Sequence, residues 1–179
     1  MGRTDIRLVS TLASVLAGMA LVVFAADVSA QDAAKPADAA AVTRCLREHK
    51  DAESCIGVVS DDCMRQPGGD STMGMNECLS REIAVWDARL NAAYKAALAG
   101  FVASQTLDRY DAKAGTTTSI KGANLVRDTE RAWIAYRDLK CAAAQLPMAG
   151  GTGASLLGGS CLLRETARQA IWLGSLNTP

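Results

Sequence analysis

The sequence predicts an all-α fold, an antiparallel helical hairpin followed by a third C-terminal helix and stabilised by disulfides. Three observations support this prediction. Apolar residues recur at steps of three and four in two long stretches, apolar residues make up 49% of the chain, and no stretch of useful length alternates apolar and polar residues as a half-buried strand does. The 179 residues are enough for one domain with at most a small addition.

The first long helix is predicted after the break at Pro67-Gly68-Gly69. Thr72 or Asn76 can cap its start, and Gly100 lies near its end. Its apolar stripe, which we expect to face the core, consists of Leu79, Ile83, Trp86, Leu90, Tyr94 and Ala97.

The second helix is predicted between a polar connection at residues 104–119 and Pro147, which cannot continue a helix. A glycine-rich flexible loop follows at residues 149–155, and the third helix is expected over 161–176. The apolar stripe of the second helix, again expected to face the core, consists of Leu125, Thr129, Ala132, Tyr136, Leu139, Ala143 and Leu146.

These helix ends set an expected register for the hairpin. The first helix ends near Gly100 and the second begins near Ser119, so residues whose numbers add to about 219 should lie level with each other. The expected neighbours are Trp86 with Trp133, Ile83 with Tyr136, and Glu82 with Arg137. An Arg137–Glu82 contact would then fix the register beside a pair of indole rings.

The first 30 residues are predicted to be a signal peptide. Arg3 and Arg7 precede an apolar run over 12–26, and Val28-Ser29-Ala30 supplies small residues at a cleavage site. An uncleaved membrane anchor is the alternative, but the uninterrupted apolar core is short for a membrane span. We therefore expect a periplasmic or secreted protein with no stable membrane anchor after cleavage.

The rest of the chain divides into three predicted segments. Residues 31–41 read as a disordered tether of alanine and polar residues, and residues 42–66 form a Cys-rich N-terminal segment. Residues 67–179 are predicted to form the helical domain.

Six cysteines lie after the predicted cleavage site: Cys45, Cys55, Cys63, Cys78, Cys141 and Cys161. An even number in a small exported chain indicates a disulfide framework, for which fifteen complete pairings exist. We favour the bridges local in sequence, Cys45–Cys55, Cys63–Cys78 and Cys141–Cys161, with Cys78–Cys141 as the main rival. The chain has one His and no closely spaced Cys pair, so neither a metal nor another cofactor is predicted.

Charge is balanced overall but uneven along the chain. Residues 31–87 carry 11 acidic and 6 basic side chains, and residues 88–179 carry 6 acidic and 11 basic ones. Complementarity between two halves of one fold is the preferred interpretation, and a charged patch that meets an oppositely charged partner is the alternative. No nucleic-acid partner is predicted, because the whole chain has no net charge.

Two groups of residues carry a resemblance to a known family. One group is Met75-Asn76-Glu77-Cys78-Leu79 with Trp86-Asp87-Ala88-Arg89-Leu90-Asn91, and the other is Arg131-Ala132-Trp133-Ile134-Ala135-Tyr136-Arg137-Asp138. These strings are similar to the two halves of the lysozyme inhibitor LprI-like N-terminal domain family. The resemblance covers about residues 63–176, and its motif residues are Trp86, Asp87, Leu90, Asn91, Tyr94, Trp133, Tyr136, Arg137 and Asp138. Glu130 stands where the family commonly has Gln, and Cys45 and Cys55 are additional to its usual four cysteines.

The resemblance implies a small exported helical domain that binds a lysozyme-like glycoside hydrolase, and no enzyme activity of its own. Such a hydrolase works with two carboxylates in a cleft, so an inhibitor needs a loop that offers hydrogen-bond donors to them. The candidate loops are residues 150–159 and residues 105–121, the second of which carries Arg109, Lys113 and Lys121. The alternative is a structural or envelope-associated interaction module with no enzyme target.

Overall fold

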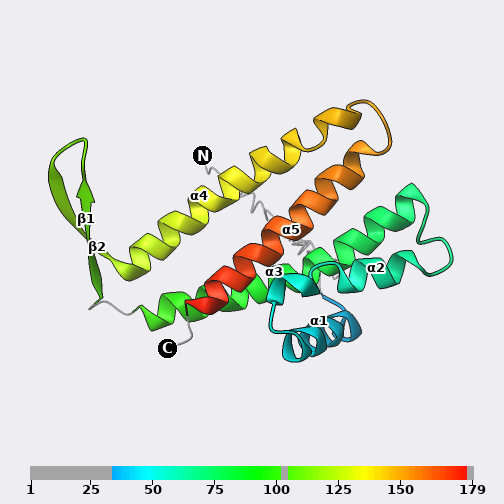
Figure 1. Ribbon diagram of the computed structural model, residues 1–179, viewed down its shortest axis with the longest axis horizontal. Coiled ribbons are helices and arrows are strands. Elements are labelled where there is room, and N and C mark those ends of the chain that lie inside the picture. The colour runs from blue at the N-terminus through cyan, green and yellow to red at the C-terminus, as the bar shows by residue number, and fades with distance from the viewer. Residues whose placement is uncertain (1–33, 102–104, 177–179) are drawn as a thin grey trace, which may run out of the picture. The chain divides into compact units, whose positions relative to one another are not determined.

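Three long helices form the body of the computed structural model, which describes residues 34–101 and 105–176. Helix α5 lies between α3 and α4 and packs most extensively on α3 (Figure 1). The elements in chain order are α1 Pro36–Glu48, the 3-10 turn η1 Ala52–Cys55, α2 Val58–Met64, α3 Thr72–Gly100, β1 Thr106–Asp111, β2 Thr116–Lys121, α4 Gly122–Ala143, the 3-10 turn η2 Leu146–Met148 and α5 Ala154–Ser175.

Helix α3 matches its prediction in extent and in its buried face. Leu79, Trp86, Leu90 and Ala97 are buried, and Ile83 and Tyr94 pack against the core from partly exposed positions. The N-cap is Ser71 and not Thr72 or Asn76, because the Ser71 hydroxyl oxygen accepts a hydrogen bond from the Gly74 amide at 3.0 Å. This is the usual way to satisfy an amide in the first turn of a helix.

Helix α4 faces the core with a different stripe from the predicted one, so that prediction is wrong. Tyr136 and Leu139 are 55% and 75% exposed, and Ala132 and Ala143 are also exposed. The inward-facing residues are Val126, Glu130, Trp133, Arg137 and Cys141. Two of them, Glu130 and Arg137, are charged, and a charged residue in a helical pattern predicts an exposed position. Polar partners allow both to lie on the inner face. Glu130, for example, accepts a hydrogen bond from the Gln169 amide at 2.8 Å.

Helix α5 begins at Ala154, seven residues earlier than expected, and contains Gly158 and Gly159. These glycines permit close packing. A Cβ atom at Gly158 would lie 2.9 Å from the Gln145 side-chain nitrogen, and one at Gly159 would lie 3.1 Å from Leu79. Glycine therefore lets α5 approach α3 and the end of α4, at the cost in helix propensity that glycine always carries.

A two-stranded antiparallel sheet corrects the all-α prediction. Strands β1 and β2 occupy most of the segment that was predicted to be a polar connection. The strand signal in the sequence is weak because a hairpin that is exposed on both faces needs no apolar alternation. Its actual signal is the β-branched run Thr116-Thr117-Thr118, since such side chains favour extended backbone.

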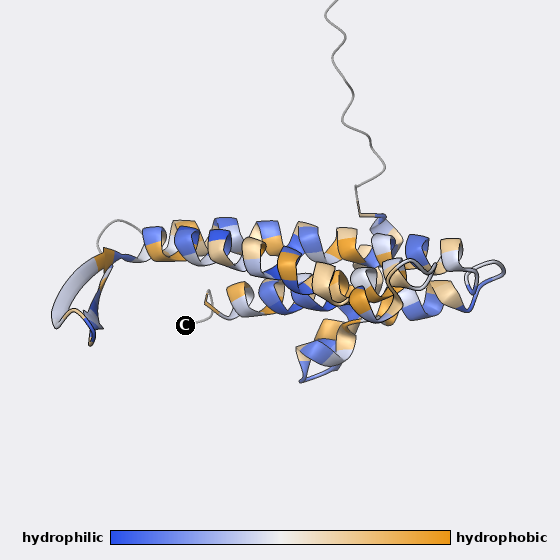
Figure 2. Cartoon of the chain, turned by 90° about the horizontal axis from the view of Figure 1, so that it is seen from above, coloured by the Kyte–Doolittle hydropathy of each residue, from blue (hydrophilic) through white to orange (hydrophobic). Residues whose placement is uncertain are grey.

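Residues 36–41, predicted to be part of a disordered tether, instead belong to helix α1, so that prediction is wrong there. Helix α1 begins with Pro36, whose fixed φ suits a first helical turn, and it buries Asp38 and Val42. Residues 31–33 of the predicted tether and the predicted signal peptide lie outside the described residues. None of the helices in the described part of the chain combines the length and the hydrophobicity that a membrane span requires. Hydrophilic and hydrophobic residues are mixed along the long helices (Figure 2).

All three favoured disulfides are confirmed. Cys45–Cys55 joins α1 to η1, Cys63–Cys78 joins α2 to α3, and Cys141–Cys161 joins α4 to α5, with Cα–Cα distances of 5.8, 5.5 and 5.3 Å. The rival Cys78–Cys141 pairing is absent from this set. Each bridge links neighbouring elements, as expected when bridged residues are close in sequence.

Candidate interaction surface

The β-hairpin extends away from the helical body at the N-terminal end of α4 (Figure 1). Its register runs from Thr106 opposite Lys121 to Asp111 opposite Thr116. Every residue of the two strands is exposed except Ile120, which is partly exposed. The hairpin therefore presents both of its faces to solvent and is the most accessible secondary structure in the described chain.

The hairpin tip is held in one conformation by Asp111. Its carboxylate accepts hydrogen bonds from the amides of Lys113 and Ala114 at 2.9 and 3.0 Å, and its carbonyl accepts one from the Gly115 amide at 2.7 Å. Gly115 has a φ of +66°, a left-handed conformation that glycine adopts without strain. The tip is thus preorganised, which lowers the entropy lost when it binds a partner.

The two carboxylates of the hairpin accept hydrogen bonds from within the hairpin, whereas its cationic side chains make no ion pair among the described residues. Asp108 accepts a hydrogen bond from the Ser119 hydroxyl at 2.7 Å, and Asp111 holds the tip. Arg109, Lys113 and Lys121 are exposed, and among residues 34–101 and 105–176 no carboxylate forms an ion pair with them. The structure therefore leaves these three predicted donors available to a partner.

A hydrogen bond joins the two strands at the base of the hairpin, and an apolar pocket lies beside this base. The Gly122 amide donates to the Gln105 carbonyl at 2.8 Å, which continues the ladder to the start of α4. A pocket of about 580 Å³ lies here, and its walls include Leu107, Leu125 and Trp172. The mainly apolar lining of this pocket contrasts with the charged side chains farther along the hairpin.

The glycine-rich segment is a weaker candidate than the hairpin. Only Gly150–Gly153 lies outside a helix, because α5 takes up the rest of the predicted loop 150–159. This short turn contains no charged side chain. It cannot offer a cationic donor to a carboxylate, so we place the candidate interaction surface on residues 105–121.

The motif residues of the two helices divide between core and surface. Trp86 and Leu90 are buried, and Tyr94 and Trp133 pack against the core from partly exposed positions. Asp87 and Asn91 are exposed and bond to each other, the Asn91 side-chain amide donating to the Asp87 carboxylate at 2.9 Å. Tyr136 and Asp138 are also exposed. Most of the motif therefore builds the fold and does not form a shared site.

The predicted contact between Glu82 and Arg137 is wrong. The Arg137 guanidinium donates two hydrogen bonds to Asp138, the next residue, at 2.8 and 2.9 Å, and it lies 4.8 Å from the centre of the Trp133 ring. The Glu82 carboxylate bonds elsewhere, as described below. Arg137 thus covers the indole of its own helix and does not set the register between α3 and α4.

We expect Arg137→Ala to lower the free energy of unfolding by only about 1 kcal/mol. The Asp138 side chain is 59% exposed, so this ion pair resembles a surface pair worth about 0–1 kcal/mol, and an exposed cation–π contact adds about 0.5–1 kcal/mol. Urea unfolding of the variant measures the change. Arg109→Ala is the control and should change nothing, and a loss above about 3 kcal/mol for Arg137→Ala would restore a structural role for it.

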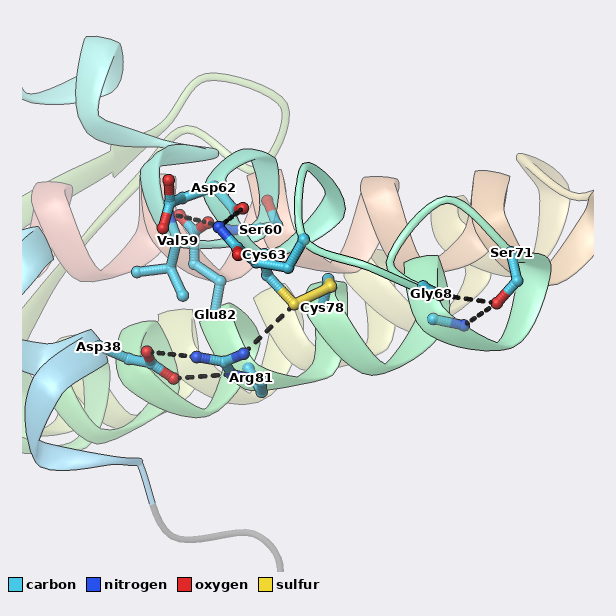
Figure 3. The surroundings of a disulfide bond; sticks show 12 residues. Asp38, Val59, Ser60, Asp62, Cys63, Gly68, Ser71, Cys78, Arg81 and Glu82 are labelled. Carbon is cyan, nitrogen blue, oxygen red and sulfur yellow. Dashed lines mark hydrogen bonds and ion pairs between the residues drawn. A yellow bond between two sulfur atoms is a disulfide. The ribbon is translucent and has the colours of Figure 1, made fainter.

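Glu82, which the expected register pairs with Arg137, is a buried carboxylate that organises the N-terminal segment. Glu82 has no exposed surface. It accepts hydrogen bonds from the amides of Gly57, Val59 and Ser60 at 2.7, 3.0 and 2.8 Å, and from the Trp86 indole at 3.0 Å. The carboxylate thus caps the start of α2, where backbone amides lack helical partners (Figure 3). No local signal in the sequence marks this long-range contact.

A second polar contact, between Asp38 and Arg81, attaches α1 to α3. The Arg81 guanidinium donates two hydrogen bonds to Asp38 at 3.0 and 2.7 Å, and a third to the Cys63 sulfur at 3.3 Å (Figure 3). The hydrogen bonding of the guanidinium to the Asp38 carboxylate raises the pKa of Arg81 above its ordinary value. The two acidic residues Asp38 and Glu82 therefore both hold the N-terminal segment on α3.

Ion pairing between the acidic and basic halves is limited. Among the described residues one ion pair joins them, Arg168 with Glu53 at 2.9 Å, and both side chains are about half exposed. The other ion pairs stay within one half, as the pair of Lys140 with Glu165 does. The hydrogen bond that Lys140 donates to Glu165 raises the pKa of Lys140. Complementarity between the halves is thus slight, which leaves the excess of basic side chains in residues 88–179 exposed to partners.

A family model described as lysozyme inhibitor LprI matches residues 63–173. The chain belongs to the lysozyme inhibitor LprI family. An uncharacterized protein of Rhizobium meliloti (strain 1021) is 32% identical over 108 residues, which is 59% of this chain and 73% of that relative. No solved structure matches the chain. The LprI match includes α3, the hairpin, α4 and two of the disulfides, whereas Cys45–Cys55 lies outside it.

Residues that could hold a metal do not gather anywhere in the described part of this LprI family member. No group of three or more His, Cys, Asp or Glu side chains is arranged to bind an ion there. All six cysteines are in disulfides, so none is available as a thiolate ligand or nucleophile.

Proposed function

We propose that this protein is an exported inhibitor that binds a lysozyme-type glycoside hydrolase through the hairpin at residues 105–121. The observation that carries the proposal is the exposed, preorganised hairpin. Its carboxylates accept hydrogen bonds within the hairpin, and its cationic side chains remain available to a partner. Membership of the lysozyme inhibitor LprI family supports the choice of partner. Inhibition requires binding and no chemical step, so the protein needs no catalytic residue of its own.

The hairpin suits the cleft of such an enzyme in charge and in shape. Glycoside hydrolases place two carboxyl groups about 5–9.5 Å apart on either side of the bond they cleave. Arg109 can bind a carboxylate through two parallel hydrogen bonds, and Lys113 can bind as a compact charge. The other turn residues at the tip are Ala112, Ala114 and Gly115, so the tip is slender and Lys113 is its single long side chain.

The proposed location is the periplasm or the exterior of the cell. Three disulfides persist in oxidising compartments and are rare in the cytosol. A signal peptide at residues 1–30, cleaved near Ala30, would deliver the chain there. In this proposal the exported chain comprises the N-terminal segment and the LprI helical domain together.

We expect the double variant Arg109→Ala/Lys113→Ala to inhibit a purified lysozyme-type enzyme about 100-fold less strongly than the wild type, or weaker still. Hydrogen bonds to charged groups contribute about 1.5–3 kcal/mol each, which is about tenfold or more in binding. The measurement is the rate of cell-wall turnover as a function of inhibitor concentration. The contact of Lys113 with Asp111 and the strand pairing of Arg109 are made by the backbone, which alanine retains, so the thermal unfolding temperature should not change.

The matched control removes two positive charges from another surface. Lys95 on α3 and Arg164 on α5 are exposed, and Lys95→Ala/Arg164→Ala changes the net charge by the same amount. This control should inhibit like the wild type. An equal loss in both double variants would show that total charge and not the hairpin determines binding, and a wild-type protein that leaves turnover unchanged would refute the proposal.

The second candidate function is an envelope-associated interaction module without an enzyme target. The exposed apolar residues on α4 favour it, because Tyr136, Leu139 and Leu146 lie in the open on a single helix and its continuation. Exposed apolar patches mark interaction sites. The turnover assay separates the two candidates, since a module of this kind would not slow the hydrolase.

A further inference from the structure

The apolar stripe that sequence analysis placed in the core instead forms a row on the open side of α4. Tyr136 is 55% exposed, Leu139 is 75% exposed and Leu146, just past the helix end, is 70% exposed. Ala132 and Ala143 complete the exposed part of the row, and Leu125 and Thr129 extend it with partly exposed side chains. We call these seven residues the α4 seam.

The spacing of the α4 seam is that of a coiled coil. Six of its members lie on α4 and follow one another at steps of four and three from Leu125 to Ala143, and Leu146 follows at the next step just past the helix end. A repeat of 3.5 residues keeps one row of side chains facing a partner helix along its whole length, and such rows are the a and d positions of coiled coils. The residues that face the core, such as Val126, Trp133 and Cys141, form a separate row. The α4 seam therefore fits a second helix outside the described fold.

We propose that the α4 seam binds the same seam of a second copy of this chain, with the two α4 helices antiparallel around a two-fold axis level with Ile134. In this register each large seam residue lies level with a small one of the other copy. The resulting layers are Leu125 with Ala143, Leu139 with Thr129, and Tyr136 with Ala132. Large residues opposite small ones interdigitate, as well-packed layers do.

The same register matches the ends of the seam. Leu146 of one copy lies level with Gly122 of the other, where the 580 Å³ apolar pocket opens at the base of the hairpin. Leu125 and Thr129, both in the seam, line that pocket. Leu146 of one copy, an exposed leucine, thus meets an apolar pocket on the other. In the same register Asp128 of one copy lies level with the oppositely charged Lys140 of the other copy.

The contact area is sufficient for a weak but specific dimer. The 22 residues of α4 give a seam about 33 Å long. Fourteen seam side chains, seven from each copy, would together bury an area on the order of 1,000 Å², taking about 60–120 Å² for each apolar side chain. Specific interfaces begin at about this size. We therefore expect a dissociation constant on the order of 1–100 µM.

Analytical ultracentrifugation of the purified, disulfide-intact protein from about 1 to 300 µM tests the proposal. The weight-average mass of the wild type should rise from that of a monomer to that of a dimer. Leu139→Glu should weaken dimerisation by about 100-fold or more, because it places a charge in a central layer. Leu139 is already exposed, so circular dichroism should show an unchanged fold. A wild type that stays monomeric over the whole range overturns the proposal.

Ile134→Glu is the matched control. Ile134 is a large apolar residue on the same helix, 41% exposed, but it is not a member of the seam. This variant should dimerise like the wild type. An equal loss for Ile134→Glu and Leu139→Glu would show that association follows general surface hydrophobicity and would overturn the seam.

The antiparallel arrangement has its own readout. Spin labels attached at Asn124→Cys, an exposed position in the first turn of α4, should lie about 30 Å apart in an antiparallel dimer, given a rise of 1.5 Å per residue. A parallel dimer would bring them to about 10 Å, close to the distance between packed helix axes. The shorter distance would overturn the proposed register.

Discussion

Glu82→Gln is expected to lower the free energy of unfolding by about 3 kcal/mol. The carboxylate of Glu82 is fully buried, and each of its oxygens accepts two hydrogen bonds. Glutamine has nearly the same shape but keeps one acceptor oxygen, so its NH₂ group must face two N–H donors. Leaving a buried donor without an acceptor costs about 1–3 kcal/mol, which gives this estimate for two donors.

Thermal unfolding followed by circular dichroism measures the effect of Glu82→Gln. For a chain of this size a loss of 3 kcal/mol lowers the unfolding temperature by roughly 10 °C. Glu77→Gln is the control, because Glu77 is an exposed carboxylate on the same helix and surface substitutions usually change stability by less than about 0.5 kcal/mol. Equal shifts for the two variants would contradict the role of Glu82 as a cap of α2.

Removing the Cys141–Cys161 bridge with alanine at both positions is expected to destabilise the protein by on the order of 3 kcal/mol. The bridge closes a loop with a sequence separation of 20, and the chain-entropy account assigns about this value to a loop of that length. The effect should concentrate in α4. That helix packs less extensively on its neighbours than α3 and α5 pack on each other, so the bridge is a main attachment of its C-terminal end.

Amide hydrogen exchange locates the change. Without the bridge the amides in the C-terminal half of α4 should exchange faster, because local opening becomes easier there. The matched control is the alanine double variant of Cys45 and Cys55, whose loop has a separation of 10. It should lose a similar amount of stability but increase exchange in α1 and η1. Unchanged protection of α4 after loss of Cys141–Cys161 would contradict the proposed attachment.

The features predicted correctly from the sequence are local ones. Helix α3 follows from a stripe of large apolar residues with little competition on the other faces, and the disulfides follow from cysteines that lie close in sequence. Cys78 lies on α3 and Cys141 on α4, and α5 lies between these helices over much of their length (Figure 1). Cys161 of α5 is bonded to Cys141.

The errors arise where polar residues occupy the inner face of a helix. On α4 the seam looks more apolar than the true inner row, which includes Glu130 and Arg137. Their burial depends on partners that a helical pattern does not reveal, such as Gln169 on α5. Glu82 was misplaced for the same reason, since its partners lie more than 20 positions away in the chain.

The candidate surface was predicted in position but not in structure. Residues 105–121 and their three cations were identified from charge and from the connection they make between helices. The two strands were not predicted because both faces of the hairpin are exposed to solvent, so apolar and polar residues do not alternate along them. Once the hairpin is known, the internal use of Asp108 and Asp111 explains why only the cations remain available.

The capping of α2 by Glu82 means that the family boundary and the folding boundary of this protein do not coincide. The family match begins at residue 63, after the three amides that the carboxylate binds. A chain limited to the matched region would retain a buried anion with the Trp86 indole as donor but without the three amides, and Arg81 would likewise lose Asp38. Relatives that lack a segment equivalent to residues 36–62 should therefore carry an uncharged residue at the position of Glu82, so the two features are expected to be gained or lost together during evolution.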